Sequence, residues 1–191
     1  MDRLPTLIVI IALVACDKGG DKQAEPGSRV NAAKVTAKKT DTAAFCDKQY
    51  SVETAPAFQT PELAGGGGLA SSSGKWRWVN VWATYCKPCV DELPRIAKWQ
   101  KTMPFELQTI SVDESEDDVI AFRKLHPDTP EGKRLAKPDA QGAWYGQLGL
   151  DAGAPIPVHI FVDASNKVRC VRAGGVREQD QAMVEAVFAG K

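Results

Sequence analysis

The sequence has no excess of charge of either sign, because 24 Lys and Arg residues balance 24 Asp and Glu residues over 191 positions. Proteins that bind nucleic acids through their phosphates carry an excess of Lys and Arg. The composition therefore gives no support to a nucleic-acid partner. The length allows one ordinary domain with additional sequence outside it.

The sequence also lacks an apolar run long enough to span a bilayer comfortably, which takes about 20 residues. Residues 4–15 (LPTLIVIIALVA) follow Arg3 and have the length of a signal-peptide hydrophobic region, with a buried N-terminal helix as the alternative. Residues 13–16 (LVAC) resemble the lipobox of bacterial lipoprotein signal peptides. This resemblance implies that residues 1–15 are removed and that Cys16 carries lipid chains that anchor the protein to a membrane.

Residues 16–44 contain no aromatic residue and are rich in Lys, Asp, Gly and Ala. Such a composition cannot bury enough apolar surface to offset the entropy lost on ordering. We therefore expect a lipidated N-terminus and a flexible tether over residues 16–44, and a folded domain over residues 45–191.

The folded domain is predicted to alternate between strands and helices. Apolar, β-branched and aromatic residues predict strands at residues 76–82, 105–112, 157–162 and 168–172. Helical spacing predicts helices from residue 88 onward and over residues 115–125, 143–150 and 178–189, with a loop over residues 126–142. This order predicts an α/β domain whose central sheet has helices on both faces.

Five acidic residues lie around the start of the second predicted helix: Asp113, Glu114, Glu116, Asp117 and Asp118. The helix dipole favours acidic side chains in a first turn, and Ser115 is suited to cap it. We therefore expect a solvated helix start here rather than a cation site, because nothing fixes a coordination geometry.

Cys86 and Cys89 stand two residues apart where a predicted strand gives way to a helix. A structural zinc site needs four ligands, and Cys46, Cys170 and the two histidines are isolated in the sequence. A purely structural disulfide across so short a loop would restrict the unfolded chain little. Exchange between a dithiol and a disulfide is the interpretation that remains.

The position of Cys86 at a helix start favours it as the nucleophile. Free N–H groups and the dipole at a helix N-terminus stabilise an anion, so the Cys86 thiolate should be favoured. Pro88 suits the first helical turn, where its missing N–H costs nothing, and Lys87 adds positive charge beside the nucleophile. Cys89 lies one turn further on and would resolve a mixed disulfide.

Residues 78–94 (WVNVWATYCKPCVDELP) closely resemble the active-site segment of the TlpA/ResA-like thioredoxins. Residues 55–58 (APAF), 107–113 (LQTISVD) and 157–163 (PVHIFVD) are similar to further motifs of that family. The resemblance implies a thioredoxin-like fold with a central mixed sheet flanked by helices. It also implies thiol–disulfide exchange without a cofactor or a metal, in a membrane-tethered domain that faces the periplasm or another extracytoplasmic space.

The same resemblance implies that Ile156–Pro157 is a cis peptide bond packed against Cys86, with Pro155 as the competing position. The carbonyl and N–H groups of Ile156 would then be presented to an extended segment of a substrate protein. Tyr85 directly precedes Cys86 and is expected to be exposed as part of this surface. The expected substrate-binding residues are Tyr85, Lys87, Pro88 and Ile156.

Glu92 matches the glutamate of the family's motif and lies one helical turn beyond Cys89. We predict that it acts as acid or base for the dithiol, although on spacing alone a half-exposed surface carboxylate fits equally well. Asn80 stands where cytoplasmic thioredoxins usually have a buried aspartate, which removes that base. For His159, which replaces a common threonine, we favour a packed and hydrogen-bonded side chain over a proton relay.

Cys46 and Cys170 remain once Cys16 is assigned to lipid and the Cys86–Cys89 pair to exchange. In an oxidising compartment an even remainder favours pairing. We therefore predict a Cys46–Cys170 disulfide, with two free buried thiols as the alternative.

These inferences predict a monomeric, lipid-anchored thiol–disulfide oxidoreductase. Its expected partners are cysteine-containing protein substrates and a membrane electron-donor protein, and the reducing direction follows the tendency of the family. A copper metallochaperone of thioredoxin fold is the alternative, although such proteins usually carry C-x-x-x-C and a downstream histidine. A peroxidase of the peroxiredoxin class would need Pro and Thr where Val79 and Ala83 stand.

Overall fold

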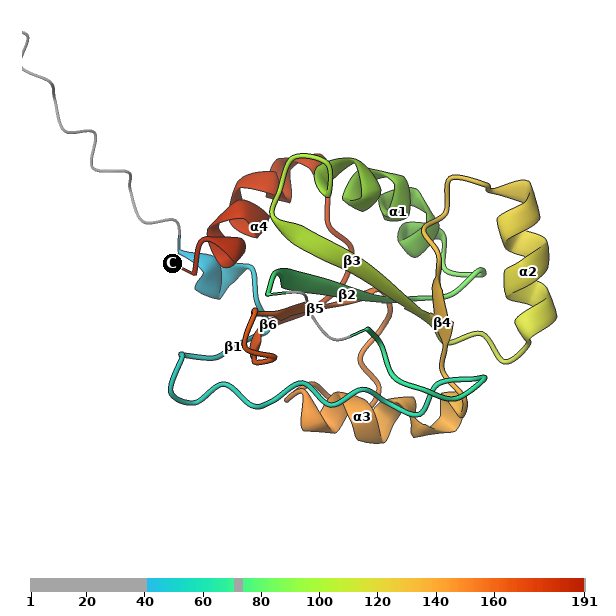
Figure 1. Ribbon diagram of the computed structural model, residues 1–191, viewed down its shortest axis with the longest axis horizontal. Helices are drawn as coiled ribbons and strands as arrows, with labels where there is room; N and C mark the ends of the chain where they lie inside the picture. The colour runs from blue at the N-terminus through green and yellow to red at the C-terminus, as the bar shows by residue number, and fades with distance from the viewer. Residues whose placement is uncertain (1–40, 71–73, 191) are drawn as a thin grey trace, which may run out of the picture. The chain divides into compact units, whose positions relative to one another are not determined.

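The computed structural model describes residues 41–70 and 74–190 (Figure 1). The predicted signal peptide, Cys16 and most of the predicted tether lie outside the described residues. Among the residues that are described, no helix has both the length and the apolar character that crossing a membrane requires.

The described residues form a central six-stranded mixed sheet. Its strands, in spatial order, are β1 (Lys48–Gln49), β6 (Val168–Ala173), β5 (Val158–Val162), β2 (Trp76–Trp82), β3 (Phe105–Ser111) and β4 (Gly132–Arg134). The β2–β3 and β3–β4 pairs are parallel, and the β1–β6, β6–β5 and β5–β2 pairs are antiparallel. The central strand β2 is buried along nearly its whole length, which explains its continuous run of apolar and aromatic residues.

Four α-helices surround this sheet within the described ranges: α1 (Lys87–Trp99), α2 (Glu116–Leu125), α3 (Gln141–Gln147) and α4 (Gln181–Phe188). Helices α1 and α4 cover one face of the sheet and α3 covers the other (Figure 1). On the first face, the Trp78 ring packs against Trp99 of α1 and Phe188 of α4, with ring centroids 6.2 and 6.1 Å apart. This packing sets the position of α1, whose N-terminus carries Cys86.

The strands and helices predicted from the sequence are present, with shifts of one or a few residues at their ends. The prediction of a loop over residues 126–142 is wrong in two places. Gly132–Arg134 form β4, which pairs with β3, and Pro138–Ala140 form a 3-10 helix. Strand β4 is short and lies at the sheet edge, so its residues need no apolar alternation. Gly132 is required there because a Cβ atom would lie 1.9 Å from Thr109 Oγ1.

Ordered structure extends to the N-terminal side of the boundary predicted at residue 45. Thr42–Ala44 form a 3-10 helix capped by Asp41, whose Oδ1 accepts a hydrogen bond from the Ala43 N–H at 2.9 Å. Thr42 is buried, and its Oγ1 accepts a hydrogen bond from Gln49 Nε2 at 2.7 Å. The last residues of the predicted tether are thus part of the fold. At the other end, the predicted final helix begins as the 3-10 helix Glu178–Asp180 and continues as α4.

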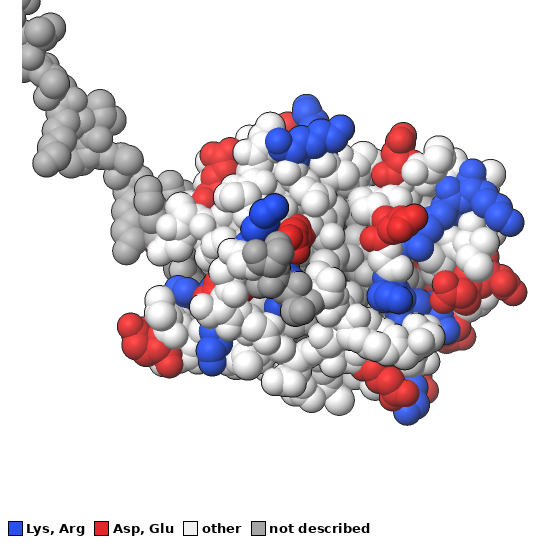
Figure 2. Space-filling model, viewed as in Figure 1, with Lys and Arg blue, Asp and Glu red and all other residues white. Residues whose placement is uncertain are grey.

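Charged side chains of both signs are intermingled on the face shown in Figure 2. Among the described residues, oppositely charged side chains also form ion pairs, such as Lys137–Glu62 at 2.8 Å and Arg134–Glu116 at 3.1 Å. This face therefore does not present the extended positive surface that phosphate binding requires.

Candidate active site

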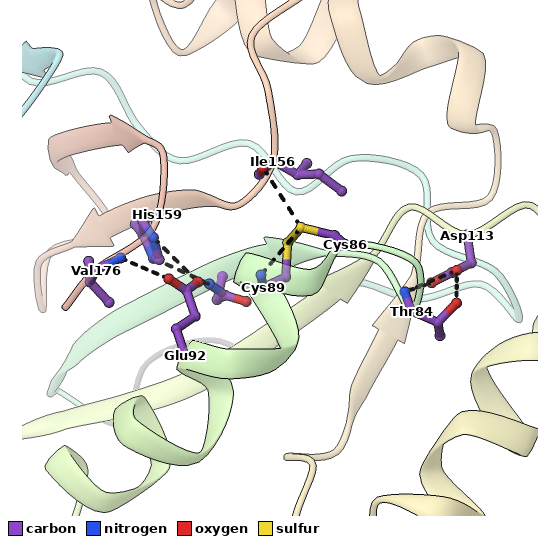
Figure 3. The surroundings of a disulfide bond; sticks show 9 residues. Thr84, Cys86, Cys89, Glu92, Asp113, Ile156, His159 and Val176 are labelled. Carbon is purple, nitrogen blue, oxygen red and sulfur yellow. Dashed lines mark hydrogen bonds and ion pairs between the residues drawn. A yellow bond between two sulfur atoms is a disulfide. The ribbon is translucent and has the colours of Figure 1, made fainter.

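Cys86 is the N-cap residue of α1, and Cys89 lies one turn inside the helix. The Cys86 Sγ accepts a hydrogen bond from the Cys89 N–H at 3.3 Å, which satisfies one of the free donors at the helix start. The two cysteines form a disulfide with their Cα atoms 5.3 Å apart (Figure 3). Cys89 is fully buried and Cys86 is 7% exposed, so Cys86 is the sulfur of this pair that a partner can reach.

The loop before β5 lies directly beside this disulfide. The peptide bond Ile156–Pro157 is cis, so the cis bond lies at Pro157 and not at Pro155. The carbonyl oxygen of Ile156 lies 3.8 Å from the Cys86 Sγ (Figure 3). The backbone of Ile156 is therefore part of the immediate surroundings of the Cys86 sulfur.

Glu92 projects from α1 into the protein and is 1% exposed, so the alternative of a half-exposed carboxylate is wrong. Its Oε1 accepts a hydrogen bond from Asn80 Nδ2 at 2.9 Å, and its Oε2 accepts one from the Val176 N–H at 2.8 Å. These donors satisfy the carboxylate where water cannot. The structure thus holds a buried carboxylate on the helix that carries both cysteines.

His159 is fully buried on β5, and the prediction of a packed, hydrogen-bonded side chain is confirmed. Its Nδ1 lies 3.1 Å from Trp78 Nε1 and 3.2 Å from Asn80 Nδ2. Its Nε2 lies 3.5 Å from Glu92 Oε1. The histidine therefore joins the group of polar side chains around Glu92.

The charge of Lys87, which was expected to favour the Cys86 thiolate, is paired with a carboxylate. Its Nζ forms an ion pair with Asp91 Oδ2 at 2.6 Å, and both side chains are largely exposed. The neighbouring carboxylate and the solvent offset the lysine charge. Stabilisation of a Cys86 thiolate therefore rests on the N–H groups at the start of α1 rather than on Lys87. Tyr85, by contrast, is 73% exposed beside Cys86, as predicted.

Asp113 is 2% exposed, so its placement in a solvated acidic cluster is wrong. Its carboxylate accepts hydrogen bonds from the Thr84 N–H at 3.1 Å, from Thr84 Oγ1 at 2.6 Å and from Ser111 Oγ. Thr84 belongs to the turn that leads from β2 to Cys86 (Figure 3). Asp113 thus holds the active-site turn in place. The signal in the sequence is an acidic residue just after β3, because the parallel neighbour β2 ends beside it.

We expect Asp113→Asn to lower the free energy of unfolding by about 2–3 kcal/mol. Both carboxylate oxygens of Asp113 accept hydrogen bonds, and the substitution would replace one of them with an NH2 group that faces donors instead of accepting from them. The exchange rate of Cys86 should fall as well, since the preceding turn loses its anchor. Urea unfolding and thiol-exchange kinetics measure the two effects. Glu114→Gln, at the exposed neighbouring position, is the matched control and should change stability by less than about 0.5 kcal/mol. Equal effects of the two substitutions would contradict this role of Asp113.

Cys46 and Cys170 form a disulfide with their Cα atoms 5.5 Å apart. The bridge joins the segment before β1 to β6, and both cysteines are buried. It lies in the hydrophobic cluster that contains Trp78 and Phe188, whereas Cys86 and Cys89 lie in the other cluster of the core. The Cys46–Cys170 bridge is therefore placed to stabilise the fold.

Two further predictions concern lipidation and metal binding. Cys16, the predicted lipidation site, lies outside the described residues. Within residues 41–70 and 74–190, no group of three or more His, Cys, Asp and Glu side chains is arranged to hold a metal ion.

No protein-family model matches the chain. The thioredoxin-like protein YneN of Bacillus subtilis is 37% identical over 76 residues, which are 37% of this chain and 45% of YneN. The thiol-disulfide oxidoreductase ResA of Bacillus cereus is 28% identical over 130 residues, which are 65% of this chain and 71% of ResA. The crystal structure of a thioredoxin-family thiol:disulfide interchange protein from Chlorobium tepidum TLS matches with a TM-score of 0.52 and 28% identity, and the match covers 74% of this chain and 95% of that one.

In sequence and in fold, the chain is thus similar to thioredoxin-like thiol–disulfide oxidoreductases. The predicted thioredoxin-like fold with its mixed sheet is confirmed. The alignment with YneN spans less than half of that protein's length, whereas the alignment with ResA spans most of it. Cys86 and Cys89 form the C-x-x-C pair of this thioredoxin-like domain.

Proposed function

We propose that the protein is a membrane-anchored, extracytoplasmic thiol–disulfide oxidoreductase that reduces disulfides in partner proteins. The observation that carries this proposal is the placement of the Cys86 sulfur. It lies at the start of α1, is bridged to the buried Cys89, and is 3.8 Å from the Ile156 carbonyl. A dithiol in this position needs no cofactor, because its two sulfurs carry the two electrons of the reaction.

In the reducing direction, the Cys86 thiolate attacks one sulfur of the partner's disulfide and forms a mixed disulfide. The other partner sulfur leaves as a thiolate and takes up a proton. Cys89 then loses its proton and attacks the Cys86 Sγ, which expels the second partner sulfur. The partner gains two electrons, and the protein is left with the Cys86–Cys89 disulfide seen in the structure. A membrane electron-donor protein restores the dithiol by the same exchange in reverse.

Each neighbouring group has a distinct part in this cycle. The N–H groups at the start of α1, including that of Cys89, stabilise the Cys86 thiolate. Glu92 serves as the acid or base for Cys89 from the same helix. Pro157 and Ile156 orient the partner segment. The exposed residues Tyr85, Lys87 and Pro88 contact it around Cys86.

The membrane anchor and the direction of exchange have separate support. The anchor rests on the signal-peptide-like run at residues 4–15 and on the lipobox-like sequence that ends at Cys16. The reducing direction rests on the resemblance of residues 78–94 to the TlpA/ResA-like thioredoxins, most of which act as reductants.

A Cys89→Ser variant of the full chain tests the function. Without the resolving thiol, the mixed disulfide between Cys86 and a partner cannot be released, so partner proteins should accumulate as adducts. Mass spectrometry after expression in a native membrane would identify the substrate and the electron donor. The Cys86→Ser/Cys89→Ser double variant is the matched control and should capture none. Capture of none by the single variant, together with tight copper binding by the wild type, would contradict the proposal and favour a metallochaperone.

A further inference from the structure

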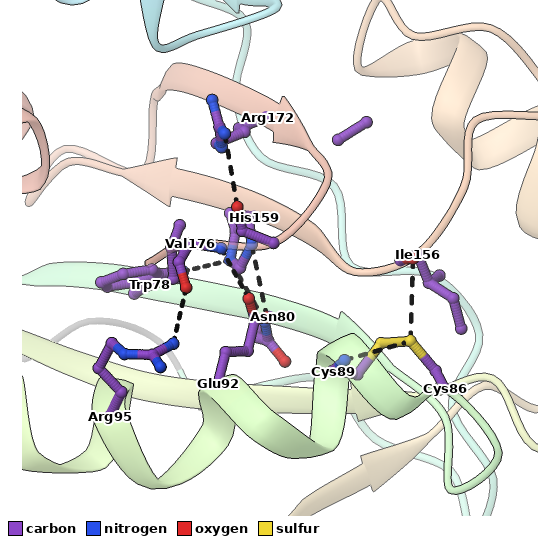
Figure 4. A network of polar contacts seen from close by, with 12 residues as sticks. Trp78, Asn80, Cys86, Cys89, Glu92, Arg95, Ile156, His159, Arg172 and Val176 are labelled. Atoms are coloured by element: carbon purple, nitrogen blue, oxygen red, sulfur yellow. Dashed lines mark hydrogen bonds and ion pairs between the residues drawn. A yellow bond between two sulfur atoms is a disulfide. The ribbon is translucent and has the colours of Figure 1, made fainter. Parts of the chain in front are cut away.

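His159 lies directly opposite Asn80 in the antiparallel pairing of β5 with β2. Opposed residues in such a pair share a face of the sheet, and Asn80 contacts Glu92 of α1 on that face. His159, Asn80, Glu92 and Trp78 therefore form one buried polar group between the sheet and α1 (Figure 4). None of the steps of the exchange cycle uses His159.

The neighbours of Nδ1 determine which nitrogen of His159 carries the proton. The indole N–H of Trp78 can only donate a hydrogen bond, and it lies 3.1 Å from Nδ1. The Asn80 Nδ2 group, which donates to Glu92 and can only act as a donor, also lies 3.2 Å from Nδ1. Nδ1 is consequently an acceptor without a proton, and the proton of the neutral ring resides on Nε2.

The Nε2–H group then faces Glu92, whose Oε1 lies 3.5 Å away. The other charged groups nearby are engaged elsewhere. Arg95 of α1 donates to the Val176 carbonyl at 2.8 Å, and Arg172, opposite His159 on β6, donates to the carbonyls of Phe45 at 2.8 Å and Gly175 at 3.4 Å. The Glu92 carboxylate thus accepts hydrogen bonds from Asn80 and Val176, while His159 Nε2 faces it from β5 at 3.5 Å without forming a hydrogen bond (Figure 4).

We propose that His159 is a positioning residue that acts through Glu92. Held as the Nε2–H tautomer by Trp78 and Asn80, it presents a fixed N–H dipole to the carboxylate and favours its charged form, which is the form that can accept the proton of Cys89. It does not relay that proton, because its second nitrogen already accepts hydrogen bonds. This inference rests on the proposed function of Glu92 and of the dithiol.

The chain offers a matched pair of variants at this position. His159→Asn retains an acceptor near Trp78 Nε1 but removes the N–H that faces Glu92. His159→Gln places an amide N–H near the position of Nε2 and should restore the contact. His126, the other histidine, is exposed at the end of α2, and His126→Asn is the control for loss of an imidazole elsewhere.

The reaction of the reduced protein with 5,5′-dithiobis(2-nitrobenzoate) separates the two steps. One coloured thiolate is released when Cys86 forms the mixed disulfide, and a second is released when Cys89 resolves it. In His159→Asn, the second release should lose rate at the acid end of its pH profile. That part of the profile should shift to higher pH by about one unit, so the rate at a fixed pH there should fall about tenfold. The first release should keep its wild-type profile, and His159→Gln and His126→Asn should behave like the wild type.

Nitrogen-15 NMR of the histidine rings provides a second readout that does not depend on activity. His159 should carry its proton on Nε2, with Nδ1 unprotonated. A proton on Nδ1 of His159, or an unshifted second release in His159→Asn, would overturn the inference and leave the exchange function intact. Failure of the wild type to show either release would instead contradict the proposed function, and the NMR result would still decide the tautomer.

Discussion

Cys86→Ser is expected to abolish thiol–disulfide exchange, with a fall in rate on the order of 10³-fold or more. The nucleophile is a thiolate, and a serine hydroxyl neither ionises near neutral pH nor forms a disulfide. Cys89 cannot take over the attack, because it is fully buried whereas Cys86 is the sulfur of the pair that reaches the surface.

The loss should appear as the absence of both coloured thiolates when the reduced variant reacts with 5,5′-dithiobis(2-nitrobenzoate). Cys89→Ser is the matched comparison and should release one equivalent at close to the wild-type rate, because its defect lies in the second step. A Cys86→Ser protein that exchanges within tenfold of the wild type would show that Cys86 is not the attacking sulfur.

Removal of the Cys46–Cys170 bridge should lower the free energy of unfolding by about 4–5 kcal/mol. The two cysteines are 124 residues apart in the sequence, so the bridge greatly restricts the unfolded chain. For a domain of this size the corresponding fall in melting temperature is about 10–20 °C. Urea and thermal unfolding of Cys46→Ala/Cys170→Ala against the wild type measure this effect.

The second disulfide supplies the internal control for that experiment. Cys86 and Cys89 are 3 residues apart, and the same chain-entropy relation gives about 2 kcal/mol for their bridge. The Cys46→Ala/Cys170→Ala variant should keep its exchange activity, since its bridge lies in the other hydrophobic cluster of the core. The Cys86→Ser/Cys89→Ser variant should therefore be destabilised less than Cys46→Ala/Cys170→Ala. Equal destabilisation of these two variants, or loss of exchange in Cys46→Ala/Cys170→Ala without loss of stability, would contradict a purely structural role for the Cys46–Cys170 bridge.

Several features of the site could be predicted because they depend on residues that are close together in the sequence. The placement of Cys86 and Cys89 follows from a buried strand that ends just before them and from helical spacing that starts just after them. Ser115 caps α2 for a similarly local reason, since its side chain accepts a hydrogen bond from the Asp118 N–H three residues on. The exposure of Tyr85 follows from its place in the same turn as Cys86.

Other features could not be predicted, because they depend on contacts between distant segments. Asp113 resembles its acidic neighbours in the sequence, and it is buried only because β3 ends beside the turn that contains Thr84. The strand β4 pairs with β3 at a position where a Cβ atom on residue 132 would clash with Thr109, so the pairing requires a glycine there.

The amino-acid sequence by itself determined the α/β class, the Cys86–Cys89 pair and the order of most strands and helices, because periodicity and helix starts are local properties of the chain. Only the tertiary structure decided the surroundings of Glu92. Its partners Asn80, His159 and Val176 come from β2, β5 and the loop after β6, and they meet the carboxylate only when the sheet packs against α1. The chemical state of a buried group depends on the donors and acceptors that face it, and these are assembled by the packing of distant segments.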